Sequence, residues 1–322
     1  MKVLWKTSLK RCLNHKEGRL IKLQNILPKI AIKGTEDRRH AILSFLKEHN
    51  VKYYLQEIEE KYPVYSSSAT KDLDGEFEDI YDDLDDDYFG FFNCQYDKVT
   101  EYKSKYYYNI IVDIGDFENA KQKILLTAHY DVVYGSSGAN DNGSSISILL
   151  KLITEYNGTP IRIVFFDGEE CGGIGSRNYI EKYITTDELK NEYIMLNLDV
   201  CGCGDKIVIE NQIKNIKYDD VSNFCKLNDI IEINRLPFND AKIFDRKDIS
   251  NICIVALPQE DIDISNGKEI IDPITGRKQY FGSYIWKYQH NGIYDDIAYI
   301  NYNIMEQIYD CIKNKLLFSI FL

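Results

Sequence analysis

The sequence predicts an α/β fold, with a mixed, mostly parallel β-sheet that carries helices on both faces. From residue 105 onward, short apolar runs typical of buried strands alternate with longer amphipathic stretches typical of helices. In addition, a chain of 322 residues with 44% hydrophobic content is long enough for one large α/β domain with a proper core. We therefore expect residues 35–322 to form a single domain.

The chain starts with a basic segment, residues 1–34, which we expect to be an arm outside this domain. Residues 1–39 hold eleven Lys and Arg against three Asp and Glu. A helix is predicted over residues 35–49, with Thr35 as its N-cap, followed by a strand near 51–58. The apolar face of this helix consists of Ala41, Ile42, Phe45 and Leu46.

Residues 66–104 interrupt the pattern and are predicted to be an acidic insert in the domain. Within this segment, residues 72–97 hold eleven Asp and Glu and no Lys or Arg, a composition typical of an exposed or mobile segment. Interleaved Phe and Tyr residues leave a lid or docking element as the alternative. The basic arm could pair with this insert, or both could be separately solvated surface.

The rest of the chain alternates between strands and helices. Strands are predicted at residues 106–113, 124–128, 161–166, 193–198, 206–210 and 252–256. Helices are predicted at about residues 143–156, 173–184, 217–228 and 301–317. In open α/β sheets, ligand sites lie beyond the carboxyl ends of the strands, so the residues just after each strand are the first place to look for function.

Composition excludes several classes of partner. The net charge of -12 argues against nucleic acid, because phosphate binding requires a basic face. No run reaches the roughly 18 apolar residues of a membrane helix, and the first residues lack the apolar core of a secretory signal. The eight cysteines show no paired CxxC spacing, which favours a reduced protein with buried thiols. We therefore expect a cytoplasmic protein without nucleic-acid or membrane partners.

Acidic and imidazole side chains follow the ends of three predicted strands. In chain order these ends carry His129 and Asp131, then Glu169 and Glu170, then Asp199. Asp141 stands at the start of the helix that follows the first of them. Buried carboxylates beside apolar strands are costly unless a cation compensates, and His with Asp and Glu is a ligand set typical of catalytic zinc. The convergence predicts a metal site for two zinc ions.

The residue types also suggest roles within this site. Two metal ions about 3.5–4 Å apart need a bridging carboxylate, and Asp141 suits that role because nearby glycines let the backbone turn tightly. Asp131 is placed to accept a hydrogen bond from the ring of His129 and orient it. Glu169 and Glu170 are adjacent and point differently, so one should bind metal while the other takes a proton from water.

Five segments carry a joint signature: His129-Tyr-Asp131, Gly138-Ala-Asn-Asp141-Asn, Asp167-Gly-Glu-Glu-Cys-Gly-Gly-Ile-Gly-Ser176, Asn197-Leu-Asp199 and His290. In combination they resemble the co-catalytic zinc aminopeptidases, a family that also includes glutaminyl cyclases and the transferrin-receptor-like domains. The resemblance covers roughly residues 105–315. It implies the zinc-exopeptidase fold, which is also described as phosphorylase/hydrolase-like.

The resemblance also implies residue roles. It implies five zinc ligands, with Asp141 bridging: His129 and Asp199 for one ion, Glu170 and His290 for the other. Glu169 would be the general base that takes a proton from water and returns it to the leaving amine. In relatives the peptide bond after the bridging aspartate is cis, so the resemblance implies a cis Asp141–Asn142 bond.

We therefore expect a zinc-dependent aminopeptidase that acts on peptides, with residues 258–289 lining its specificity pocket. A glutaminyl cyclase is the alternative, supported by Phe165–Glu170 and by Asp240, although the compact Glu170–Ser176 segment is aminopeptidase-like. A non-catalytic receptor-like domain is a second alternative, but such relatives lose metal ligands and all five are present here. Ala241 replaces a histidine of the relatives, a change that bears on substrate choice.

Overall fold

The computed structural model describes most of the chain. The described residues are 21–65, 99–213, 218–271, 273, 276–280, 282, 287, 289–290 and 294–316. They divide into two compact units, one made of Met1–Gln56 with Tyr108–Leu322 and one made of Glu57–Tyr107. All the candidate site residues belong to the first unit.

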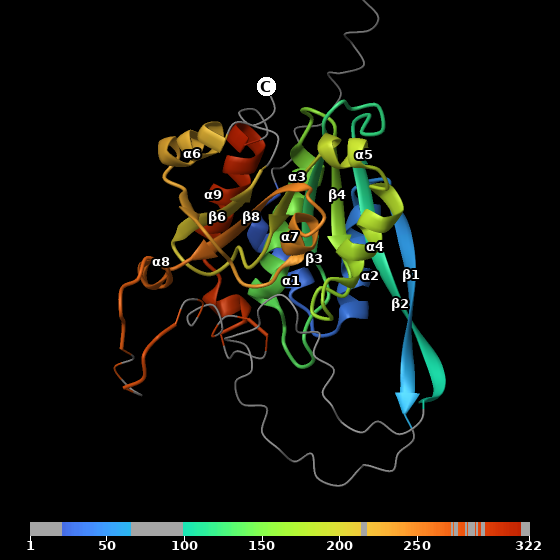
Figure 1. Cartoon of the computed structure of the whole chain (residues 1–322), viewed down its shortest axis with the longest axis horizontal. Helices are drawn as coiled ribbons and strands as arrows, with labels where there is room; N and C mark the ends of the chain where they lie inside the picture. Colours follow the sequence, from blue (N-terminus) through green and yellow to red (C-terminus); the bar gives the residue numbers. More distant parts are fainter. Residues whose placement is uncertain are drawn as a thin grey trace, which may run out of the picture. The chain divides into compact units, whose positions relative to one another are not determined.

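Within the described part, eight strands form one sheet in the order β1-β2-β4-β3-β5-β8-β6-β7 (Figure 1). Their bounds are β1 (Tyr54–Tyr65), β2 (Val99–Ile114), β3 (Lys123–His129), β4 (Ile161–Phe166), β5 (Tyr193–Leu198), β6 (Lys206–Gln212), β7 (Ile231–Ile233) and β8 (Ser250–Leu257). Strands β4, β3, β5 and β8 run parallel, whereas β2 is antiparallel to β4 and β6 is antiparallel to β8. The predicted mixed, mostly parallel sheet is confirmed.

The helices follow the predicted pattern, with several short additions. Their bounds are α1 (Leu23–Ile30), α2 (Thr35–Glu48), η1 (Ala139–Ser144), α3 (Ser145–Glu155), α4 (Ile174–Tyr183), α5 (Asp187–Glu192), α6 (Tyr218–Leu227), α7 (Asp240–Asp245), α8 (Gln259–Ser265), η3 (Ile297–Tyr299), α9 (Tyr302–Cys311) and η4 (Ile312–Leu316). The sequence prediction omits α1, α5, α7, α8 and the three-residue strand β7. Apart from α1, each of these is at most seven residues long, too short for a clear periodic pattern.

Two hydrophobic cores lie on opposite faces of the sheet. Along β3, Ile124 and Leu126 pack into one core, and Leu125 between them packs into the other. The first core includes buried residues of α1, α2, α3 and α9, and the second includes buried residues of α4, α7 and α8. The side chains of a strand alternate between the two faces, so helices cover both faces as predicted.

Helix α1 lies within the segment expected to be a basic arm, yet it belongs to the core. Its buried residues are Leu23, Ile26, Leu27 and Ile30. This spacing of three and four residues places them on one side of a helix. The chain from Leu23 onward is therefore part of the folded unit, whereas residues 1–20 lie outside the described residues.

Helix α2 begins at the predicted residue, but the predicted cap is wrong. The N-cap position belongs to Gly34, with φ 98°, and Thr35 is the first helical residue. The Thr35 hydroxyl instead accepts a hydrogen bond of 3.3 Å from the backbone amide of Val132. Because that amide follows β3, the hydroxyl joins the helix to a distant loop rather than to its own first turn.

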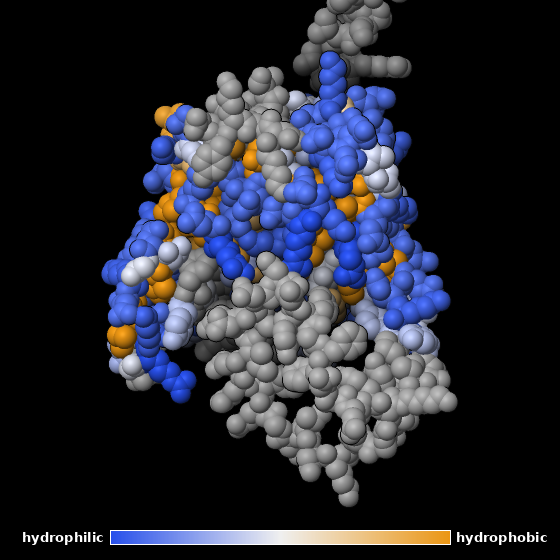
Figure 2. Space-filling view, in the orientation of Figure 1, coloured by the Kyte–Doolittle hydropathy of each residue, from blue (hydrophilic) through white to orange (hydrophobic). Residues whose placement is uncertain are grey.

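The predicted acidic insert is described only at its end. Residues 66–98 lie outside the described residues, and residues 99–104 belong to strand β2 rather than to the insert. Strand β2 extends further than predicted because Val99, Thr100 and Tyr102 are residue types that favour strands. In the described part of the chain, no helix is both long enough and apolar enough to cross a membrane. Figure 2 shows a largely hydrophilic described surface with small separate hydrophobic patches.

Candidate metal centre

The parallel pairing of β3, β4 and β5 brings their carboxyl ends to one edge of the sheet. His129, the last residue of β3, is paired with Phe166, the last residue of β4. On the other side, Thr127 of β3 is paired with Asn197 of β5, so Asp199 emerges at the level of His129. The polar residues after these strands therefore meet, as the sequence predicts.

A first group of possible metal ligands consists of His129, Asp141 and Asp199, all of them buried. Nε2 of His129 lies 3.1 Å from Oδ1 of Asp141 and 3.6 Å from Oδ1 of Asp199. That Asp199 oxygen is buried and has no hydrogen-bond partner. A buried acceptor without a donor is costly in a folded protein, and a cation would satisfy it.

A second group consists of Asp141, Glu170 and His290. Nε2 of His290 lies 3.7 Å from Oδ2 of Asp141 and 3.3 Å from Oε2 of Glu170. Asp141 is thus common to both groups, with Oδ1 facing one imidazole and Oδ2 facing the other. The structure brings together all five residues that the sequence analysis assigns as ligands.

The spacing within each group fits a divalent cation. Ligand atoms about 2.0–2.2 Å from a tetrahedral zinc ion lie about 3.3–3.6 Å from one another. The four contacts between imidazole nitrogen and carboxylate oxygen run from 3.1 to 3.7 Å. Burial, together with the nearby charge of Asp141, raises the pKa of both Asp199 and Glu170. A bound cation would stabilise the charged form of these carboxyl groups.

Asp131 anchors the segment that carries the two glutamates. Its Oδ1 accepts a hydrogen bond of 3.1 Å from the amide of Glu169, and its Oδ2 accepts one of 3.0 Å from the amide of Glu170. The same Oδ1 lies 3.3 Å from Nδ1 of His129, but that nitrogen forms no hydrogen bond of good geometry. Asp131 therefore faces the ring as predicted, and it also fixes the backbone beyond β4.

Glu169 is close to one ligand candidate of each group. It is buried, and its carboxylate forms with His129 and Glu170 a third set of side chains that could hold a metal ion. Burial raises the pKa of Glu169 well above its ordinary value; the charge of His129 opposes this, and the charges of Asp240 and Asp199 add to it. This placement gives the site a carboxyl group that can exchange a proton without being a ligand of either group.

The backbone around Asp141 has the predicted cis peptide bond, between Asp141 and Asn142. Two side chains tie this turn to the end of β5. The Asn142 amide donates a hydrogen bond of 3.0 Å to the carbonyl of Leu198, and Asn140 Oδ1 accepts one of 2.7 Å from the amide of Gly202. The position of Asp141 is therefore fixed relative to Asp199.

Asp295 is a site residue that the sequence analysis misses. Its carboxylate accepts hydrogen bonds from the Ser136 hydroxyl at 2.6 Å, the Asn140 amide at 2.7 Å and the Asp141 amide at 3.3 Å. It follows His290 by five residues in the chain. This closeness to the last ligand candidate was the available signal.

Asp240 is buried at the start of α7, and neither of its carboxylate oxygens has a well-formed hydrogen bond. Burial raises the pKa of Asp240 to about 7. Ala241 and Phe244 of the same helix are buried and pack in the second core.

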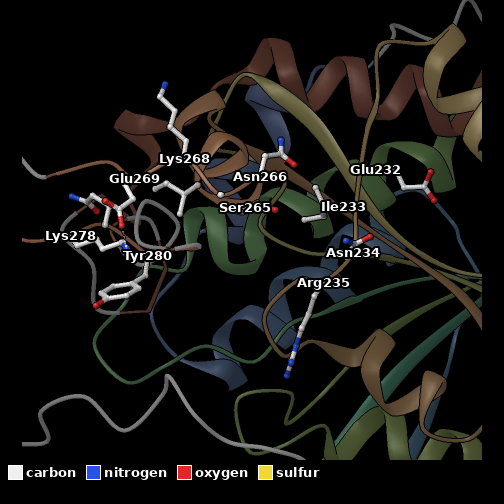
Figure 3. A pocket seen from close by; sticks show the side chains of 13 residues that line it. Glu232, Ile233, Asn234, Arg235, Ser265, Asn266, Lys268, Glu269, Lys278 and Tyr280 are labelled. Atoms are coloured by element: carbon white, nitrogen blue, oxygen red, sulfur yellow. Dashed lines mark hydrogen bonds and ion pairs between the residues drawn. The ribbon is translucent and has the colours of Figure 1, made fainter.

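A cavity of about 690 Å³ lies away from these residues and is lined by three segments (Figure 3). They are Glu232–Arg235, Ile264–Glu269 and Lys278–Tyr280. The last two segments come from residues 258–289, which the sequence analysis expects to line a specificity pocket. Phe281, Tyr284, Trp286 and Tyr288 of that stretch lie outside the described residues. The specificity role of residues 258–289 stays a prediction.

Comparison with known proteins identifies relatives in sequence and solved structures with a similar fold. The model of "Peptidase family M28" matches residues 109–314. Aminopeptidase YwaD of Bacillus subtilis is 40% identical over 98 residues, which are 29% of this chain and 21% of that protein. The chain thus matches about a fifth of the length of that curated relative.

Two solved structures share the fold over nearly the whole chain. An aminopeptidase from Aneurinibacillus sp. strain AM-1 has a TM-score of 0.60 at 14% identity, covering 90% of this chain and 92% of that one. The glutaminyl cyclase of Porphyromonas gingivalis has a TM-score of 0.55 at 16% identity, covering 90% and 93%. At such identities the likeness shows the fold alone, and both activities occur on it.

Proposed function

The chain belongs to peptidase family M28, and on this basis we propose that it is a zinc-dependent aminopeptidase removing N-terminal residues from peptides. The strongest support is the geometry of Asp141, whose two carboxylate oxygens face the separate imidazoles of His129 and His290. A carboxylate shared by two neighbouring metal positions is the arrangement expected of a two-metal hydrolytic site.

The five ligand candidates divide naturally between two zinc ions. One ion would be held by His129, Asp141 and Asp199, the other by Asp141, Glu170 and His290. Bound zinc would activate water and polarise the carbonyl group of the scissile bond. The ligand set leaves room for water and substrate, as catalytic zinc sites require.

The chain's own residues supply the proton transfers. Glu169 would accept a proton from the attacking water and return it to the leaving amine nitrogen. Asp131 supports this role, because its bonds to the amides of Glu169 and Glu170 fix both glutamates relative to His129. The raised pKa of Glu169 makes the protonated form accessible, so the carboxyl group can serve as acid in the second step.

The proposal is tested by zinc content and by product analysis. Protein stripped with a chelator and reloaded should bind two zinc ions per chain, measured by elemental mass spectrometry. A panel of dipeptides and longer peptides with a free α-amine should lose one N-terminal residue, whereas the same peptides with an acetylated N-terminus should stay intact. Cleavage of the acetylated peptides at internal bonds, or no cleavage by zinc-loaded protein, would rule out an aminopeptidase.

A glutaminyl cyclase is the second candidate, supported by the buried Asp240, whose charge acts on Glu169. A second carboxyl group beside the proton-transferring glutamate could take part in ring closure. Offering a peptide with N-terminal glutamine separates the two activities by mass. Loss of ammonia indicates cyclisation, and loss of the whole residue indicates hydrolysis. The cytoplasmic location expected from the sequence stays a prediction.

A further inference from the structure

Arg38 of helix α2 is fully buried, and its hydrogen bonds go to backbone carbonyls. Its Nε donates to the carbonyl of Ile30 at 3.1 Å. Nη1 lies 3.4 Å from the carbonyls of both Tyr130 and Asp131. Nη2 donates to the carbonyls of Ser137 and Gly138, at 2.9 Å each. One guanidinium therefore holds three separate stretches of chain.

Two of these stretches adjoin two of the five candidate ligands, His129 and Asp141. Tyr130 and Asp131 directly follow His129, and Gly138 precedes Asp141 by three residues. The planar fork of an arginine presents its donors in fixed directions, so it can set the distance between two loops. Arg38 thus fixes the His129 end of β3 relative to the turn that carries Asp141.

Gly138 provides a second, independent observation on the same contact. A Cβ atom added to this glycine would lie 2.1 Å from Nη2 of Arg38, well inside contact distance. The residue also has φ 53°, a left-handed conformation that favours glycine. The same Cβ would also lie 2.5 Å from the carbonyl oxygen of Asp141 and 2.8 Å from the side chain of Val132, so a glycine here lets Arg38 and the Asp141 turn approach each other closely.

The positive charge of Arg38 is compensated by nearby carboxylates, although none of its hydrogen bonds goes to a carboxylate. Burial lowers the pKa of Arg38, but the charges of Asp141, Asp295, Asp131 and Glu170 act in the opposite sense. A buried cation is costly without compensation, and the ligand carboxylates provide that compensation. In zinc-free protein, Arg38 would in turn reduce the repulsion among those carboxylates.

We propose that Arg38 is a positioning residue that holds the two ligand loops in place before zinc binds. The inference rests on the zinc site of the proposed function, but not on the peptidase activity. The planar arrangement of the guanidinium donors matters more than their positive charge, because the acceptors lie on separate stretches of chain. A lysine keeps the charge, but its donors share one nitrogen and cannot reach all these carbonyls.

The test compares Arg38→Lys with a matched control, Arg39→Lys, on the same helix. Arg39 donates its hydrogen bond to the side chain of Glu36 at 3.1 Å and lies over the ring of Tyr108, and a lysine keeps the positive charge that acts on Tyr130 and Asp167. Zinc affinity is measured by competition with a chromophoric chelator. Loss of a partner that orients ligands costs about 10- to 100-fold in metal affinity, so we expect at least a tenfold loss for Arg38→Lys and less than twofold for Arg39→Lys.

Steady-state kinetics at saturating zinc provide a second readout. We expect kcat to fall at least tenfold for Arg38→Lys with KM within about twofold, because the substrate contacts are unchanged while the reacting groups are displaced. If Arg38→Lys matches Arg39→Lys in zinc affinity, the positive charge is sufficient and the positioning role is wrong.

Hydrogen exchange on the unaltered, zinc-free chain tests the inference even if Arg38→Lys does not fold. In this loop the amide of Gly138 donates a hydrogen bond to the Ser136 hydroxyl, and the amides of Asn140 and Asp141 donate to the carboxylate of Asp295. We expect these amides to be protected without zinc, and exchange at the rate of an open chain would overturn the inference. Zinc uptake without peptide hydrolysis would refute only the proposed function, whereas a parent chain that takes up no zinc would refute both.

Discussion

Replacing Asp167 with Asn should make the zinc-free protein more stable at neutral pH. Asp167 is buried just after β4, where its Oδ2 accepts hydrogen bonds from the amide of Tyr108 at 2.9 Å and the hydroxyl of Tyr130 at 2.8 Å. Burial and the charge of Asp131 raise the pKa of Asp167 from 3.8 to about 6. The folded state therefore favours the protonated carboxyl more than the unfolded state does.

The sign and size of the effect follow from this difference in pKa. Below pH 3.8 the carboxyl is protonated in both states and costs nothing. As pH rises to about 6 the unfolded state loses its proton first, so folding stability falls, and the loss is complete above that pH. Since a tenfold change in proton affinity is worth about 1.4 kcal/mol, the total loss is about 3 kcal/mol.

An asparagine keeps the oxygen acceptor and cannot ionise. Because about 0.6 kcal/mol of this loss has already occurred at pH 4, we expect the stability advantage of Asp167→Asn over the parent to grow by about 2.4 kcal/mol between pH 4 and pH 7.5. The measurement is urea unfolding at both pH values in the presence of a chelator. The exposed Asp116→Asn change controls for the loss of one negative charge. If the difference in stability between Asp167→Asn and the parent is the same at both pH values, the reasoning is refuted.

Three further changes test the site and the core. Glu169→Gln should keep the parental zinc content and lose about 10²-fold or more in kcat, because only the proton acceptor is removed; parental activity would refute the general-base role. Asp141→Ala should bind at most one zinc ion in elemental analysis, and retention of two would refute the bridging role. Leu27→Ala should lower the free energy of unfolding by about 2–5 kcal/mol in urea, because Leu27 is fully buried in α1; a change below about 1 kcal/mol would show that α1 contributes little to the core.

The meeting of these ligand candidates was predictable from the sequence because their signal is local. His129 ends one apolar strand, Glu170 and Asp199 follow two others, and parallel pairing alone brings such positions to one edge. The placement of Asp141 beside them was also predictable, since glycines surround it in the chain. For these residues, the order of strands and polar residues along the chain is enough to predict which side chains come together.

Arg38 and Asp295 could not be assigned in the same way. Arg38 bonds to carbonyls about a hundred residues away, and Asp295 bonds to amides more than 150 residues away. Any residue presents a backbone carbonyl or amide, so no sequence motif marks such a partner. Helix α1 was missed for another reason: Lys22, Pro28 and Lys29 lie within or beside it and obscure its apolar spacing.

Helix α1 also determines how the amino end of this protein can be altered. Its last residue, Ile30, offers the carbonyl that receives the Nε–H of Arg38, and its apolar side faces α3 and α9. A shortened version that starts after residue 31 would expose that side of the core to water. It would also remove the carbonyl of Ile30 that helps to hold Arg38 beside the metal centre.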